Sequence, residues 1–139
     1  MIVASKFEPP NHNRGKAIME IKSLRLRRNE ERRLLAGHLW IYSNEVNSKI
    51  TPLKQFSPGE QVEIESHSGK SLGTGYINPR SLICVRMFSR KSTILDYNLL
   101  MARVKQAYRL RQRLFDEPFY RLVYGESDLL PGLVVDRFG

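Results

Sequence analysis

Basic side chains are concentrated between Lys22 and Arg33, where six of twelve residues are Lys or Arg. An arginine guanidinium pairs with a phosphate through two hydrogen bonds and stacks on exposed bases. The whole chain carries 23 Lys and Arg against 14 Asp and Glu, a net charge of +9. Such an excess favours a polyanionic partner, because each neutralised phosphate releases counterions. We therefore expect this cluster to bind nucleic acid, with a merely solvated charged face as the alternative. Its members are Lys22, Arg25, Arg27, Arg28, Arg32 and Arg33.

Aromatic rings follow the basic cluster closely. His38, Trp40 and Tyr42 come within ten residues of Arg33, and they could add stacking surfaces for RNA bases. Alternation places Trp40 and Tyr42 on one face of a strand and Ile41 on the other. Small barrels need large residues inside, so core packing is the favoured role for Trp40 and RNA stacking is the alternative. We include His38 with the basic cluster as a predicted RNA-binding residue.

Catalytic and metal-binding patterns are absent. His12, His38 and His67 are scattered, and none has a metal-ligand spacing such as i, i+4 on a helix. The single cysteine, Cys84, excludes an intramolecular disulfide and any multi-cysteine zinc site. It lies in an apolar strand-like segment without a neighbouring His–acid pair, so we expect it to pack as a small hydrophobe. No Gly-rich phosphate loop is present, and the sequence predicts no catalytic, cofactor or metal site.

Two carboxylates near the end of the chain could suggest general acid–base chemistry. Glu126 and Asp128 stand two residues apart in "GESD", a spacing compatible with a carboxylate pair. However, they occupy a short loop closed by Pro131-Gly132, where turn and cap roles are more common. We expect both side chains to be structural.

The elements that position these residues form two groups. In the first, Leu24 to Arg27 alternate as a half-buried strand does, and a short helix follows with Asn29 as its N-cap and Gly37 as its stop. Strands are predicted at 39–46, 61–66, 71–78 and 81–89, separated by turns. Short strands at this density predict a small closed or half-closed β-barrel. Gly73 and Gly75 within a strand indicate bending or close backbone approach.

The periodicity changes near residues 90–93. Residues 96–116 have a helical apolar stripe that includes Leu100, Val104 and Ala107, and strands are predicted at 120–124 and 133–137. The last strand leads into a turn with no returning strand, so we expect residues 133–139 to be frayed, or 133–138 to pair with a neighbouring chain. The first 18 residues read as a flexible tail, with Met19 as an alternative start. The sequence has no apolar run near the ~20 residues that a membrane span requires, and it has no secretory signal. We therefore expect a cytoplasmic protein.

Several motifs together resemble a known family. The resemblance to a PUA domain is carried by "LRRNEERRLLAGHLWIYSNEV" and "PGEQVEIESHSGKSLGTGYINPRSLICVRMFSR". A third segment, "AYRLRQRLFDEPFYRLVYGESDLLPGLVVDRFG", resembles the start of the domain that follows it. The family is the PUA-type, S-adenosylmethionine-dependent 23S ribosomal RNA 5-methylcytosine methyltransferases. Where that family usually reads Gly-His-Pro-Trp, this chain has Gly37-His38-Leu39-Trp40, which frees one backbone N–H and loosens the entry to the strand.

The resemblance implies an α+β fold: a PUA-type small mixed β pseudo-barrel with a short helix over residues 19–91, followed by an incomplete helix-plus-strands segment over 92–139. It implies ribosomal RNA as partner. S-adenosylmethionine and the catalytic cysteine would belong to a Rossmann-like domain that is absent here, so this chain is expected to be inactive alone and to hold no cofactor. A free-standing PUA-type RNA-binding adaptor is the alternative function.

Overall fold

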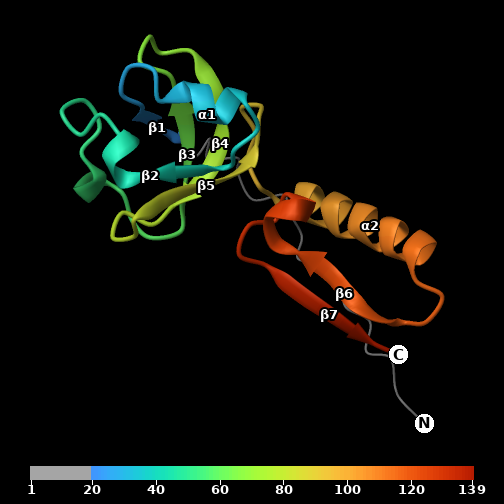
Figure 1. Ribbon diagram of the computed structural model, residues 1–139. Coiled ribbons are helices and arrows are strands. Elements are labelled where there is room, and N and C mark those ends of the chain that lie inside the picture. Colours follow the sequence, from blue (N-terminus) through green and yellow to red (C-terminus); the bar gives the residue numbers. More distant parts are fainter. Residues whose placement is uncertain (1–19) are drawn as a thin grey trace.

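The computed structural model describes residues 20–139 (Figure 1). The predicted flexible tail of residues 1–18 and the alternative start at Met19 lie outside the described residues. A sheet unit is connected to a long helix that packs on a hairpin (Figure 1). Strands and helices are mixed in this way in an α+β protein, and the predicted fold class is confirmed.

Five strands form one mixed sheet in the order β1-β3-β4-β5-β2. β1 runs parallel to β3, and the other neighbouring pairs are antiparallel. An antiparallel bridge between Leu26 and Val46 joins the chain just after β1 to the chain just after β2. The two edges of the sheet therefore meet, as the predicted small barrel requires. The strands are β1 (Lys22–Arg25), β2 (Trp40–Tyr42), β3 (Glu60–Glu65), β4 (Ser71–Ile77) and β5 (Ile83–Ser89).

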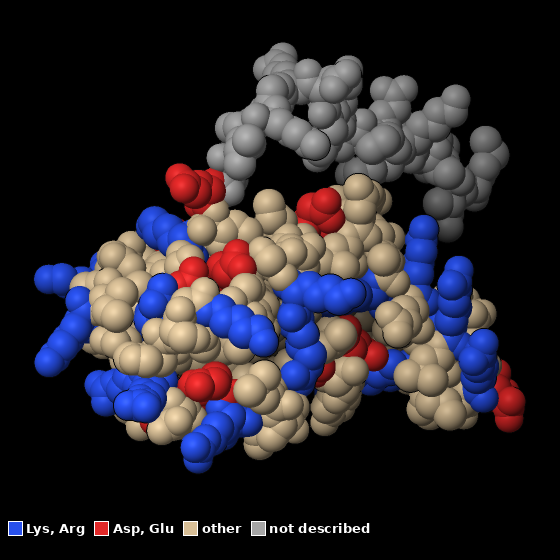
Figure 2. Space-filling view, turned by 90° about the horizontal axis from the view of Figure 1, so that it is seen from above, with Lys and Arg blue, Asp and Glu red and all other residues tan. Residues whose placement is uncertain are grey.

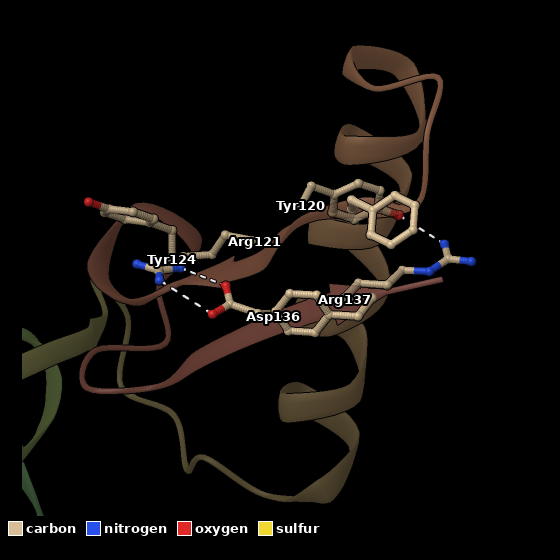
Figure 3. A pocket seen from close by; sticks show the side chains of 7 residues that line it. Tyr120, Arg121, Tyr124, Asp136 and Arg137 are labelled. Carbon is tan, nitrogen blue, oxygen red and sulfur yellow. Dashed lines mark hydrogen bonds and ion pairs between the residues drawn. The ribbon is translucent and has the colours of Figure 1, made fainter.

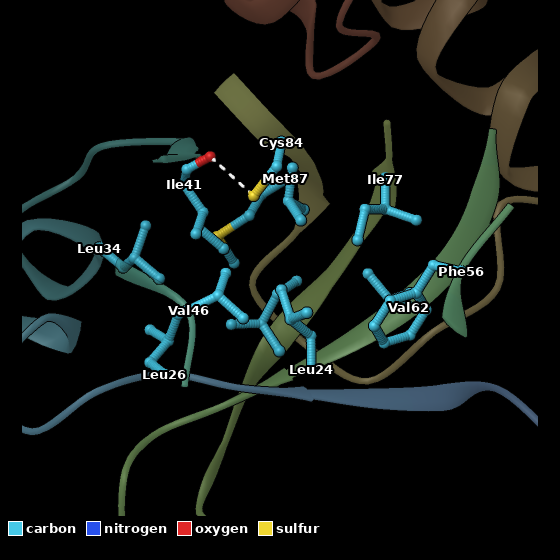
Figure 4. Packing of buried hydrophobic residues seen from close by; sticks show 12 residues of the cluster. Leu24, Leu26, Leu34, Ile41, Val46, Phe56, Val62, Ile77, Cys84 and Met87 are labelled. Atoms are coloured by element: carbon cyan, nitrogen blue, oxygen red, sulfur yellow. Dashed lines mark hydrogen bonds between the residues drawn. The ribbon is translucent and has the colours of Figure 1, made fainter. Parts of the chain in front are cut away.

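Alternate side chains of these strands fill one core (Figure 4). Leu24, Ile41 and Ile64 are fully buried there, because inward and outward positions alternate along a strand. Cys84 is buried among them, and its Sγ donates to the Ile41 carbonyl at 3.5 Å. Desolvation raises the pKa of the Cys84 thiol to about 12. Its predicted role in packing is confirmed.

The glycines of β4 allow the barrel strands to approach closely. A Cβ atom on Gly73 would lie 2.1 Å from the Ser89 carbonyl oxygen, and the backbone there has φ +133°. A Cβ on Gly75 would lie 2.6 Å from the Arg86 carbonyl oxygen. Both distances are too short for any side chain, which confirms the predicted close approach.

Two local predictions near the first helix are wrong. Helix α1 (Glu31–Leu35) has Glu30 at its N-cap, and Asn29 instead adopts a left-handed conformation with φ 71°, which asparagine tolerates well. The strand predicted over 39–46 ends at Tyr42. A 3₁₀ turn, η1 (Ser43–Glu45), follows, because the Glu45 carboxylate accepts from the Tyr42 backbone N–H at 2.8 Å. A second 3₁₀ turn, η2 (Leu53–Gln55), precedes β3.

The second unit is a helix packed on a hairpin. Helix α2 (Tyr97–Leu114) begins where the Asp96 carboxylate accepts from the Leu99 N–H at 2.8 Å. Ala107 on α2 is buried against the hairpin strands β6 (Phe119–Tyr124) and β7 (Val134–Phe138). No helix within residues 20–139 is long and apolar enough to cross a membrane.

The prediction that the last strand lacks a partner within the chain is wrong. β7 pairs antiparallel with β6, because the 3₁₀ turn η3 (Gly125–Asp128) reverses the chain between them. Figure 3 shows two side-chain contacts between the paired strands: Arg121 Nε donates to Asp136 at 2.8 Å, and Arg137 Nη1 donates to the Tyr120 hydroxyl at 3.0 Å. The expected fraying of residues 133–139 therefore loses its basis, and pairing with a neighbouring chain through 133–138 stays a prediction.

Candidate nucleic-acid interface

One end of the barrel collects basic residues from separate segments. β1 and β3 run parallel with Arg25 opposite Glu65, so both strands finish at the same end. The residues just after β1 are Arg27 and Arg28, and the turn after β3 carries His67. Two distant parts of the sequence thereby place cationic or ring side chains at one end.

A third segment completes this surface. The Leu26–Val46 bridge and the bond from the Asn47 N–H to the Arg25 carbonyl at 2.9 Å hold the loop after η1 alongside β1. Lys49 lies in this loop. Arg27 is oriented by its Nε, which donates to the Val46 carbonyl at 3.1 Å. Backbone hydrogen bonds of the barrel thus fix the main-chain positions from which these side chains extend.

Together these segments form a hollow of about 460 Å³, which we call the basic cleft; it is lined by Arg27, Arg28, Asn47, Ser48, Lys49 and His67. Three of the six are permanent cations and none is a carboxylate. Within residues 20–139, Arg28 and Lys49 make no ion pair. Amide, hydroxyl and imidazole groups beside unpaired cations are suited to phosphate oxygens. The cleft can therefore bind an anionic backbone.

The other predicted RNA-binding residues do not join the cleft. Lys22 lies at the opposite end of β1, where its Nζ pairs with Glu60 at 2.8 Å. Arg25 pairs with Glu65 at 2.6 Å. Arg32 is exposed on α1. The six clustered bases of the sequence are thus divided among several surfaces.

Sequence reasoning missed Lys49 and His67. Each lies in a different turn and carries no local motif, so only the strand pairing brings them to Arg27 and Arg28. Figure 2 shows the wider pattern from above: Lys and Arg side chains project at both ends of the molecule and across its middle, with Asp and Glu groups between them. The basic cleft is a place where cations gather without a carboxylate in the lining.

A second hollow of about 250 Å³, which we call the junction groove, lies where the two units meet; it is lined by Arg33, Gly37, His38, Leu39, Trp40 and Glu126. Arg33 is already engaged here, since it forms an ion pair with Glu45 and lies over the Tyr42 ring. His38 is exposed at this groove. Unlike the basic cleft, the groove contains a carboxylate.

The core position predicted for Trp40 is wrong. Its side chain is 37% exposed, whereas Ile41 on the opposite face of β2 is fully buried. The indole Nε1 donates to Glu126 Oε1 at 3.0 Å, and the Arg86 guanidinium lies 5.0 Å from the ring centroid. Arg86 Nη1 also donates to Glu126 Oε1 at 2.8 Å. The predicted alternation is confirmed, but the core lies on the face of Ile41 and not on the face of Trp40.

Hydrogen bonding keeps Glu126 ionised. Partial desolvation raises its pKa, but its backbone N–H, Trp40 and Arg86 oppose this and hold the pKa of Glu126 below its ordinary value. Asp128 accepts two bonds from Arg111, at 2.6 and 2.7 Å, and one from the Tyr124 N–H at 2.7 Å. The structural role predicted for Asp128 is confirmed, whereas the Glu126 side chain bonds to Trp40 and Arg86 of the barrel and not to another residue of its own turn. Residues 20–139 contain no group of three His, Cys, Asp or Glu side chains placed to hold a metal ion.

Comparison with known proteins assigns the barrel to a domain family. Residues 24–90 match the model of the PUA-like domain family, and the barrel is a PUA-like domain. Over most of its length the chain is homologous to ribosomal RNA large subunit methyltransferase I. It is 37% identical to that protein of Salmonella arizonae over 118 residues, and 37% identical to that of Shewanella frigidimarina over 120 residues.

These matches cover 82–83% of this chain but only 28–30% of the relatives. The chain therefore spans less than a third of their length. Among solved structures, a candidate SAM-dependent methyltransferase from Streptococcus mutans superposes with a TM-score of 0.69 at 18% identity, covering 86% of this chain and 31% of that one. A candidate methyltransferase solved in complex with SAH gives the same score. At this identity the likeness concerns the fold.

Proposed function

We propose that this chain is the RNA-binding region of a ribosomal RNA large-subunit methyltransferase, and that the basic cleft holds the RNA backbone. The observation that carries the proposal is the cleft itself: three cations, no carboxylate, on a PUA-like domain. Homology to ribosomal RNA large subunit methyltransferase I supports ribosomal RNA as the polyanion. A cytoplasmic location follows from that target.

Methyl transfer would belong to the complete parent enzyme. We propose that residues 19–91 serve as the RNA-binding domain and that residues 92–139 begin the next domain. The parent would transfer a methyl group from S-adenosylmethionine to cytosine C5. On this chain the described residues contribute binding and positioning: Arg28 and Lys49 contact phosphate, while Arg27 is held in place by the Val46 carbonyl.

Binding to a labelled helix of large-subunit ribosomal RNA tests this proposal. We expect Arg28→Ala with Lys49→Ala to weaken binding at least about tenfold, because two charged contacts of roughly 1 kcal/mol are lost. The matched control is Lys54→Ala with Arg80→Ala. It removes the same charge from exposed residues at the other end of the barrel, where Lys22 Nζ contacts Gln55 and Asn78 follows β4.

The control variant should bind nearly as well as the unmodified chain. Equal losses in both double variants would mean that affinity follows net charge alone and that the cleft is not the RNA site. An unmodified chain with no affinity for the RNA at low salt would overturn the proposed function altogether.

A further inference from the structure

The junction groove has features that phosphate binding does not explain. Arg86 lies over the Trp40 ring but does not line the groove. Trp40 itself lines it and stays partly exposed. The cation thus lies over the indole, while Trp40 keeps an exposed part and borders the groove. An open aromatic face backed by a cation is a surface on which a flat ring can stack.

A carboxylate oxygen stands beside this open ring. Both Trp40 Nε1 and Arg86 Nη1 donate to Oε1 of Glu126, and within residues 20–139 no other residue donates to this carboxylate. The Glu126 side chain lines the groove and is 32% exposed. Two donors from other residues fix Oε1, so the carboxylate is held in place at the groove that it lines.

From these two groups we infer that the junction groove binds one unpaired nucleobase that carries an exocyclic amino group. The base would stack on the open face of Trp40 and donate its amino hydrogens to Glu126 Oε2. Cytosine, adenine and guanine have such a group. Uracil has only a ring N–H between two carbonyl oxygens, which the carboxylate repels. This inference rests on the proposed RNA-binding function and names a second contact for the same RNA.

The groove and the basic cleft share no lining residue. The cleft offers cations to the backbone, which carry no sequence information, whereas the groove offers a stacking face and an acceptor. Trp40 comes from the barrel and Glu126 from the second unit, which the linker residue Leu95 ties to Gln61 by bonds of 2.9 and 3.2 Å. A base in the groove would contact both units at once.

The chain carries its own reporter, because Trp40 is its single tryptophan. We would titrate the full chain with two RNA hairpins that differ by one bulged cytosine, and follow tryptophan fluorescence together with the anisotropy of labelled RNA. We expect the bulged hairpin to quench Trp40 and to bind at least about fivefold more tightly than the paired one. Salt-sensitive binding of both hairpins with equal affinity and no quenching would overturn the inference while leaving the proposed function intact. Absence of any binding would instead reject the proposed function.

Two substitutions at Trp40 separate stacking from a structural role. Trp40→Phe keeps an aromatic face but loses the bond to Glu126, while Trp40→Leu loses both. Stacking predicts that the preference for the bulged hairpin persists in Trp40→Phe and disappears in Trp40→Leu. If both variants lose the preference equally, the indole acts only through its hydrogen bond and the inference is wrong.

Glu126→Gln tests base selectivity separately. The amide can still accept from Trp40 and Arg86 through its oxygen, but an amide nitrogen then faces the base. We expect a bulged cytosine to lose its advantage over a bulged uracil in this variant. An unchanged ratio of the two affinities would contradict the assigned role of Glu126.

Discussion

Arg111 on α2 and Asp128 in η3 form a bidentate ion pair with distances of 2.6 and 2.7 Å, and their side chains are only 11% and 7% exposed. The same carboxylate accepts from the Tyr124 N–H at 2.7 Å. Helix, turn and hairpin are therefore held by one side chain. The turn η3 thereby sets the direction in which β7 returns along β6.

Asp128→Ala should destabilise the chain strongly, because it leaves the buried Arg111 charge without its carboxylate. We expect a loss of about 3 kcal/mol in the free energy of unfolding, measured by urea denaturation. Asp136→Ala is the matched control, since its pair with Arg121 is 38–44% exposed, and it should cost far less. Similar losses in the two variants would show that the buried pair has no special role.

Gly73→Ala should also destabilise the barrel. The added Cβ would lie 2.1 Å from the Ser89 carbonyl oxygen, at a backbone position with φ +133°. Strain and displacement of β5 together should cost about 3 kcal/mol. Gly59→Ala is the comparison, because it has positive φ but nothing within 4 Å of its Cβ. A melting temperature for Gly73→Ala equal to that of Gly59→Ala would contradict the close packing of β4 on β5.

The Cys84 thiol should be unreactive in the folded chain. It is buried, and its pKa of about 12 leaves almost no thiolate at pH 8. We expect a thiol reagent to modify it only at the rate of unfolding, and rapidly in denaturant. Fast modification of the native chain would mean that the barrel opens there or that the thiol is exposed.

Acid should release the contact between Trp40 and Glu126. Because the folded-state pKa of Glu126 is lowered, its stabilising contribution is present above the unfolded pKa of about 4.3. It is lost as the pH falls through the lower folded value. Tryptophan fluorescence should therefore be flat from about pH 8 to pH 5 and change below about pH 4. The change should be absent in Glu126→Gln; a transition near neutral pH in both proteins would contradict this assignment.

Much of the fold could be predicted because it is locally encoded. The alternation in β3 to β5, the stripe on α2 and the glycines of β4 each repeat with the period of their element, and the structure confirms them. The wrong predictions concern residues whose conformation or strand partner is not set by the local sequence pattern. Asn29 adopts a left-handed conformation instead of capping α1. β7 pairs with β6 through a turn that was predicted only as a polar loop.

The site was less predictable than the fold. Arg27 and Arg28 were found because they belong to a dense run of bases, but charge density alone cannot say that Lys22 and Arg25 are already paired with glutamates. Lys49 and His67 reach the cleft only through the register of β1 with β3 and the bridge at Val46. Trp40 and Glu126 are 86 residues apart, and no local pattern connects them.

The salt dependence of RNA affinity tests the central claim most directly. The slope of log affinity against log salt counts the phosphates neutralised, at about 0.9 per contact on a duplex. Measured on one ribosomal RNA helix, Arg28→Ala with Lys49→Ala should reduce this slope by nearly 2, and the control pair at Lys54 and Arg80 should leave it unchanged. A slope that is the same in all three proteins would contradict phosphate binding in the basic cleft.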